Sequence, residues 1–160
     1  MAVHLVPMTP GEFQAFYDWD LHEYARELVR ADLWTEEPAL ERSLAELTRI
    51  LPQGQATPNH FFQKIISDPA ETRVGEVWYA LQTYPVGKEL FVYWLGIDEP
   101  HRRKGYATAA LRSLEAIARQ ERVRRVALAV FGHNREARRL YDQLGFSPTM
   151  LFLVKPVESE

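Results

Sequence analysis

Residues 90–111 read LFVYWLGIDEPHRRKGYATAAL, and this stretch carries the clearest signals for secondary structure in the chain. The first eight, residues 90–97, are aromatic, aliphatic or glycine, which is typical of a buried strand. From Ala107 onward, small or apolar residues recur at helical spacing through Leu111, Leu114 and Ala118. The sequence therefore predicts a strand that leads through a short turn into a helix.

The turn carries three consecutive cations, Arg102, Arg103 and Lys104, followed by Gly105. A helix that starts at this point gathers free backbone N–H groups and the positive end of its dipole at one place. Such a place binds anions, and phosphate groups in particular. An ordinary strand-to-helix loop with solvated charges explains this turn equally well when it is taken alone.

A second segment, NREARRLYDQLGF at residues 134–146, favours the anion-binding interpretation. Asn134 and Tyr141 are separated by nearly two helical turns, so they fall on one face of a helix. Gly145 is a natural end for that helix. Residues 124–130 (RRVALAV) are a predicted strand between the two segments.

The pattern R-x-x-G-x-A after an aromatic strand, with N-x-x-A-x-x-L-Y-x-x-x-G-F about thirty residues later, resembles the GNAT family of acyl-CoA N-acetyltransferases. Residues 51–60 (LPQGQATPNH) resemble a connector in a subset of uncharacterised bacterial members. The resemblance implies transfer of an acetyl group from acetyl-CoA to a primary amine of a small molecule or protein, by direct attack in a ternary complex. A non-catalytic acyl-CoA-binding regulatory module of the same fold is the alternative.

The resemblance also implies where acetyl-CoA would bind. The pantetheine arm would follow Leu95–Ile97, where the N–H of Leu95 or Ile97 would polarise the acetyl carbonyl. Gly96 is consistent with a bulge that splays this strand from its neighbour. Asn134 would bind the same arm, although a helix N-cap explains that residue as well. The pyrophosphate would lie on the turn formed by Arg102, Arg103, Lys104, Gly105, Tyr106 and Ala107.

Two residues are the candidates for the chemical step. Family members place a tyrosine hydroxyl beside the sulfur at the position of Tyr141, so its phenol is the candidate general acid, with core packing as the structural alternative. Residues 93–95 lack the carboxylate that some acetyltransferases carry there, and Glu76 on the neighbouring strand is therefore the first candidate base. His60 and Asp98 come next. A structural or solvated role remains open for all three, as does proton loss through water.

Charge and aromatic residues suggest where an acceptor would bind. Residues 1–100 hold 16 acidic and 7 basic side chains, whereas residues 101–160 hold 6 acidic and 12 basic ones. A basic part suits a polyanionic cofactor and an acidic part attracts a cationic amine, although solvated surfaces explain both. The aromatic residues that would wall an acceptor pocket, unless they belong to the core, are Trp34, Trp78, Tyr93 and Trp94.

The composition of the chain argues against several other classes of function. The chain has no cysteine, which excludes a thiol nucleophile and a thiolate metal site, and its five histidines lack ligand spacing, so we expect no metal. We expect no nucleic-acid partner, because the net charge is −3 and no basic-aromatic platform is present. A dinucleotide-binding oxidoreductase would need a G-x-G-x-x-G early in the chain and an acidic ribose ligand, and the sequence has neither. Without a signal peptide or membrane-length apolar run, we expect a cytoplasmic protein with no membrane partner, and a homodimer is compatible with the sequence.

The expected fold is α/β (α+β) in a single domain, residues 1–160. It has a mixed, mostly antiparallel central sheet flanked by about four helices, and the resemblance implies a splay between the fourth and fifth strands. A capping box, Thr9 to Glu12, marks the first helix. Strands are predicted at 3–6, 61–67, 73–84, 90–97, 124–130 and 149–154, with later helices after Thr35 to Leu51, at 104–122 and at 134–144.

Overall fold

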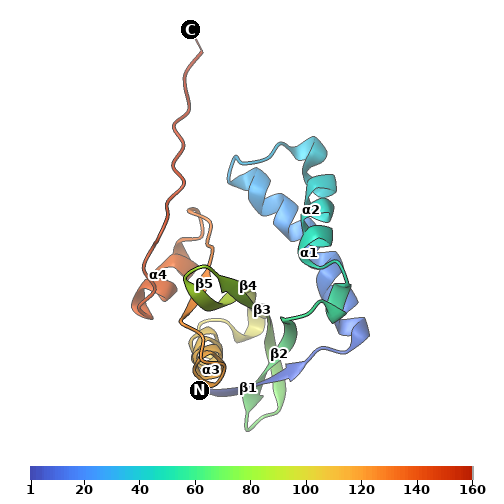
Figure 1. The fold of residues 1–160 in the computed structure, drawn as a ribbon, viewed down its shortest axis with the longest axis vertical. Helices are drawn as coiled ribbons and strands as arrows, with labels where there is room; N and C mark the ends of the chain where they lie inside the picture. The colour runs from blue at the N-terminus through green and yellow to red at the C-terminus, as the bar shows by residue number, and fades with distance from the viewer. Residues whose placement is uncertain (160) are drawn as a thin grey trace.

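A five-stranded sheet in the order β1-β2-β3-β4-β5 forms the centre of the computed structural model, which describes residues 1–159 (Figure 1). Strands β1 to β4 are antiparallel, and β5 pairs with β4 in parallel. The chain runs β1 (Ala2–Pro7), α1 (Pro10–Arg30), α2 (Glu36–Ile50), η1 (Gly54–Ala56), β2 (His60–Asp68), β3 (Thr72–Tyr84), β4 (Gly87–Ile97), η2 (Glu99–His101), α3 (Tyr106–Gln120), β5 (Arg125–Leu128) and α4 (Arg135–Gln143).

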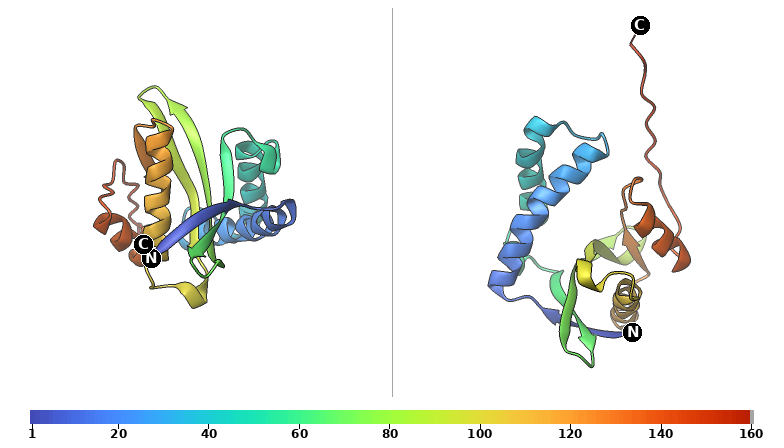
Figure 2. Two further views of the ribbon diagram at one scale, coloured as in Figure 1. Left: turned by 90° about the horizontal axis from the view of Figure 1, so that it is seen from below. Right: turned by 180° about the vertical axis from the view of Figure 1, so that it is seen from behind.

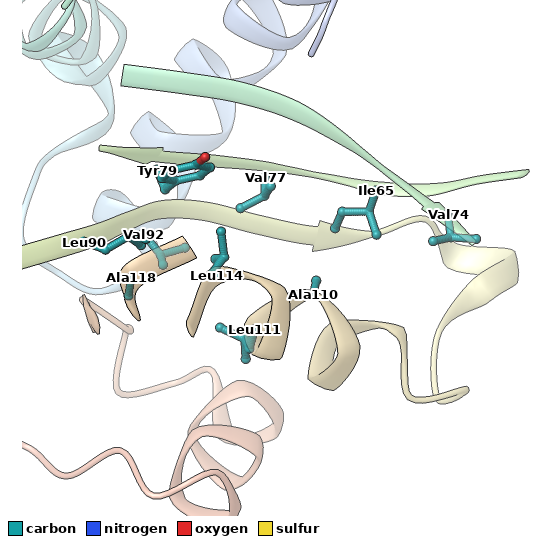
Figure 3. Close-up of a cluster of buried hydrophobic side chains, with 10 residues drawn as sticks. All are labelled: Ile65, Val74, Val77, Tyr79, Leu90, Val92, Ala110, Leu111, Leu114 and Ala118. Atoms are coloured by element: carbon teal, nitrogen blue, oxygen red, sulfur yellow. The ribbon is translucent and has the colours of Figure 1, made fainter. Parts of the chain in front are cut away.

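The sheet separates two apolar clusters. On one face, Leu111 and Leu114 of α3 are buried against Val77 and Leu90 of the sheet (Figure 3). The other face is covered by α1 and α2 (Figure 2, left). Aromatic rings of α1 meet those of β2 and β3 there. This second cluster contains Phe13, Phe16, Leu47, Phe62 and Trp78.

Helix α1 begins where the sequence predicts it. The Glu12 N–H donates to the Thr9 hydroxyl at 3.2 Å, and the Thr9 N–H donates to the Glu12 carboxylate at 2.7 Å. Both bonds of the predicted capping box are thus present. The fully buried Ser43 hydroxyl of α2 donates to the Leu21 carbonyl of α1 at 2.6 Å, which ties the two helices together.

The divergence of β4 from β5 opens the sheet. Strand β5 pairs with β4 only over Glu89–Val92. On the β3 side, Trp78 faces Trp94 and Tyr79 faces Val92, so Tyr93 is an extra residue in β4. The expected splay is confirmed, but the bulge lies at Tyr93 and not at Gly96.

Gly96 has a different structural role. A side chain at this position would place its Cβ 2.8 Å from the indole of Trp94. Because that distance is too short for a real contact, the residue must be glycine for the Trp94 ring to lie over β4. The bulge turns Tyr93 and Trp94 toward the cluster under α1.

The mixed, mostly antiparallel sheet with four flanking α-helices is confirmed, whereas the sixth strand predicted at residues 149–154 is wrong. Residues 147–159 contain no helix or strand, and their side chains are exposed. This segment runs away from the sheet (Figure 1), so it has no strand to pair with in its own chain. Among residues 1–159, none of the helices combines the length and apolar character needed to span a bilayer.

Candidate active site

A cleft of about 1460 Å³ lies where β4 has separated from β5. Its walls come from α1, the ends of β3 and β4, the turn into α3, and α4. Elements that are distant in the sequence thus contribute to one concave surface.

The turn into α3 presents unpaired backbone N–H groups to this cleft. Gly105 precedes the helix at φ 85°, in the left-handed region that favours glycine, and it provides no side-chain cap. The Ala109 N–H donates to the Gly105 carbonyl at 3.0 Å. The N–H groups before it, of Tyr106, Ala107 and Thr108, therefore lack helical acceptors, and all three residues line the cleft.

The three cations of the turn differ in position. Arg102 lines the cleft and uses its Nε to donate to the Ile97 carbonyl at 2.9 Å, which braces the turn against β4. Arg103 also lines the cleft and forms an exposed ion pair with Glu136 of α4 at 3.4 Å. Lys104 instead donates to the Pro100 carbonyl at 2.9 Å and does not line the cleft.

The last residues of β4 direct backbone groups toward the cleft. The Asp98 N–H donates to the Val74 carbonyl of β3 at 2.8 Å. Because N–H groups alternate in direction along an extended strand, those of Ile97 and Leu95 point to the opposite edge, where β5 no longer pairs. Leu95 and Ile97 both line the cleft. This edge offers hydrogen-bond donors to a bound molecule.

Helix α4 contributes Asn134 and Tyr141 to the cleft. The Asn134 side chain accepts from the Ala137 N–H at 3.2 Å, so it is the N-cap of α4. Tyr141 is partly buried beside Phe146, and burial raises the pKa of its phenol above the ordinary value. Within residues 1–159 its hydroxyl forms no hydrogen bond. A phenol in this state is protonated at neutral pH and free to donate.

Carboxylates gather at the α1 side of the cleft. Glu76 lines it and accepts a hydrogen bond from Arg73 at 2.7 Å. Burial raises the pKa of the Glu76 carboxyl, Arg73 opposes that change, and Asp98 adds to it. Asp98 also lines the cleft, 3.9 Å from the Nε of Arg73.

Asp20 of α1, which lies outside the cleft lining, was not among the predicted site residues. This side chain is 9% exposed, and burial, followed by the charges of Glu23 and Glu76, raises its pKa to about 7. A signal was present in the sequence, because Asp20 falls four residues after Phe16 on the buried face of α1. An acid at a core-facing helical position is unusual and indicates a special environment.

Only one of the four aromatic residues proposed for an acceptor pocket lines the cleft. That residue is Trp94, and Trp19 of α1 meets it edge to face with ring centroids 4.8 Å apart. The Trp94 indole N–H is buried and has no acceptor within residues 1–159. Trp78 and Tyr93 instead stack on each other in the core at 4.4 Å, and Trp34 packs on Tyr24.

His60 lies outside the cleft lining. Its Nδ1 accepts from the Trp78 indole N–H at 3.0 Å, and burial lowers the pKa of its ring. These contacts favour a structural role. Three exposed side chains that could ligate a metal ion lie close together at the β1–β2 pair, namely His4, Asp68 and Glu71. They also lie outside the cleft lining.

Replacement of Asp20 by Asn should change how stability depends on pH. The folded-state pKa of about 7 lies above the ordinary 3.8, so the unfolded chain ionises first as the pH rises. The free energy of unfolding of the wild type should therefore fall between pH 4 and 7 relative to Asp20→Asn, by about 1.4 kcal/mol per pH unit at most. Urea unfolding at several pH values measures this difference.

Asp18→Asn is the matched control, because Asp18 is exposed on the same helix. Its stability should follow the wild type across the pH range. A constant difference between wild type and Asp20→Asn from pH 4 to 8 would contradict the buried, titrating state of Asp20.

Comparison with known proteins identifies the family. The model of the acetyltransferase (GNAT) family matches residues 13–146. Two proteins of Bacillus subtilis (strain 168), the uncharacterised N-acetyltransferases YycN and YdgE, are 36% and 37% identical to this chain. Each match covers 97% of this chain, and it covers 99% of YycN and 98% of YdgE.

Solved structures agree with this result. The crystal structure of YycN from Bacillus subtilis superposes with a TM-score of 0.90 at 35% identity, covering 99% of this chain and 100% of that one. A GCN5-related N-acetyltransferase from Ralstonia eutropha JMP134 shares the fold alone, with a TM-score of 0.67 at 15% identity and coverage of 98% and 99%. The family match over most of the chain and the identity to two N-acetyltransferases show that this protein is an acyltransferase of the GNAT family.

Proposed function

We propose that the protein transfers the acetyl group of acetyl-CoA to a primary amine, with both substrates bound together in the cleft and the whole chain acting as one catalytic domain. The main support is that one cleft joins the free N–H groups at the start of α3 to the unpaired edge of β4. A long ligand with a polyanionic end and an amide-containing arm matches these two surfaces.

The turn into α3 would hold the pyrophosphate. The N–H groups of Tyr106 and Ala107 donate to its oxygens, and Gly105 allows the backbone to approach closely. Arg102 and Arg103 add positive charge, while Lys104 contributes by bracing the turn from behind. The Asn134 Oδ1 is occupied by the N-cap bond, which leaves its amide NH₂ to donate to the pantetheine arm.

The transfer step would use the edge of β4 together with α4. Acetyl-CoA supplies an activated acyl group, whose C–S bond breaks as the amine nitrogen forms a bond to the carbonyl carbon. The N–H of Leu95 or Ile97 donates to the carbonyl oxygen, where negative charge develops. Tyr141 donates its phenolic proton to the departing sulfur, since its raised pKa keeps that proton in place before the step. The proton that the attacking nitrogen loses as the amide forms returns to the Tyr141 oxygen, so the phenol is restored.

The α1 side of the cleft would receive the acceptor. Carboxylates of Glu23 and Glu76 attract an ammonium group, and Trp19 and Trp94 provide ring faces for its alkyl part. Glu76 takes the proton that the ammonium must lose before attack. Its raised pKa suits this task, although the hydrogen bond from Arg73 must be shared or broken when the proton arrives.

A screen of amines with acetyl-CoA, in which the released thiol is measured, tests the proposed function. We expect turnover with primary amines that carry a positive charge. If acetyl-CoA stabilises the protein against heat but releases no thiol in the presence of any small-molecule or peptide amine, the result would instead support an acyl-CoA-binding regulatory module.

Replacement of Gly105 by Val should abolish cofactor binding. A β-branched residue at φ 85° is strongly strained, so the turn must change and its N–H groups lose their common direction. Acetyl-CoA should raise the Tm of the wild type, as any ligand selective for the folded state does, and should not raise that of Gly105→Val. Thermal unfolding with and without acetyl-CoA measures the shift.

Gly132→Val serves as the control, because a side chain there meets nothing within 4 Å and Gly132 does not line the cleft. This variant should keep the full shift. An undiminished shift in Gly105→Val would show that the turn into α3 does not hold the pyrophosphate.

Replacement of Tyr141 by Phe should lower turnover much more than cofactor affinity. The change removes only the hydroxyl, and a proton given to the leaving sulfur acts in the transition state. We expect kcat to fall on the order of 10²-fold, with the acetyl-CoA-induced Tm shift retained. Steady-state thiol release under conditions where chemistry limits the rate measures kcat, and an unchanged value would assign Tyr141 to packing alone.

Replacement of Glu76 by Gln should reduce kcat/KM mainly at neutral pH. Without the carboxylate the ammonium loses its proton to water, so activity should partly recover as rising pH deprotonates the free amine, whose pKa is near ~10. Glu99→Gln, which changes an exposed cleft residue, should leave the pH profile unaltered. If Glu76→Gln follows the wild-type profile, the proton leaves by another route, and Asp98 or Asp20 is the next residue to replace.

A further inference from the structure

The C-terminal segment, residues 149–157, exposes an apolar run to solvent. Five consecutive residues, Met150 to Val154, are between 62% and 84% exposed, and Val157 is 91% exposed. Folded proteins rarely leave so many neighbouring apolar side chains in water unless the patch is an interface. The run is about as long as an average strand, it is rich in aliphatic and aromatic residues, and it reads as a strand buried on both faces.

The sheet has a matching open position at β5. One edge of β5 pairs with Glu89–Val92 of β4, and within residues 1–159 the other edge pairs with no strand. An unpaired edge offers a row of N–H and C=O groups to another strand. Beside it, Val130 is 38% exposed, so the open edge also carries apolar surface.

The C-terminal segment does not fill this position in its own chain. Phe146 still packs against Tyr141, but from Ser147 onward every described residue is exposed. The segment then extends away from β5 and α4, as Figure 1 and the right view of Figure 2 both show. The match to the YycN structure covers 99% of this chain, so almost all of this segment has a counterpart in that protein.

We propose that two copies of this chain exchange their C-terminal segments, so that residues 149–154 of each copy pair with β5 of the other. One chain holds both an unpaired apolar segment and an unpaired sheet edge, and a two-fold dimer satisfies both at once. The exchange is reciprocal and closes on itself, so it produces a dimer and not a filament. Each sheet gains a sixth strand, and the exposed apolar run becomes buried.

The mass of the full-length protein in solution, measured by light scattering after size exclusion, tests the dimer. We expect twice the 18.6 kDa of one chain. The double substitution Leu151→Asp/Leu153→Asp should yield a monomer, because it places charges within the exchanged strand. Val157→Asp changes an equally exposed apolar residue outside that strand and should leave the dimer intact. A monomeric wild type, or a dimer that survives Leu151→Asp/Leu153→Asp, would overturn the proposal.

A thiol cross-link distinguishes exchange from a segment that folds back on its own chain. Because the sequence has no cysteine, Ala129→Cys/Thr149→Cys introduces the only two thiols. Both positions are exposed, one just after β5 and the other at the start of the C-terminal segment. Treatment with a short bis-maleimide should give a covalent dimer in denaturing electrophoresis, above the background of the two single variants. A linked product of monomer mass would show that the segment pairs within its own chain.

Discussion

The separation of β4 from β5 after Val92 is the constraint on which the candidate site depends. Up to that residue, β4 has a strand on each side, and its backbone groups are used by the sheet. The extra residue at Tyr93 changes the direction of the strand, and the following N–H groups face a cleft in place of a neighbour. The start of α3 lies on the same cleft, so one cleft holds two sets of unpaired backbone donors. A fully paired sheet would have no such site.

Charge differs between the two ends of the cleft. Arg102 and Arg103, which come from the basic part of the sequence, stand with the start of α3. Glu23 and Glu76, which come from the acidic part, line the cleft together with Trp19 and Trp94. The uneven distribution of charge in the sequence thus becomes a polarity across one cleft. This polarity suits a polyanionic donor at one end and a cationic acceptor at the other.

Features set by local sequence could be predicted, and features set by distant contacts could not. The capping box at Thr9 and the helix after Gly105 depend on residues within a few positions, and the structure has both. The bulge at Tyr93 depends on the register with β3 and was not visible in the sequence. The position of Asp20 on the buried face of α1 could be predicted from helical spacing, but its raised pKa depends on burial and also on Glu76 of another element. Residues 149–154 have the composition of a strand, but a strand also needs a partner, which the single chain does not provide. The role of His60 stayed open in the sequence for a similar reason, because its partner Trp78 lies on another strand.

Residue-resolved hydrogen exchange with and without acetyl-CoA tests the central claim most directly. The amides of Leu95, Ile97, Tyr106, Ala107 and Thr108 lack acceptors in the free protein and should exchange rapidly there. Acetyl-CoA should slow exchange at both groups of amides together, because the acyl carbonyl and the pyrophosphate become their acceptors. Acetyl-CoA that binds without slowing exchange at either group would contradict the account.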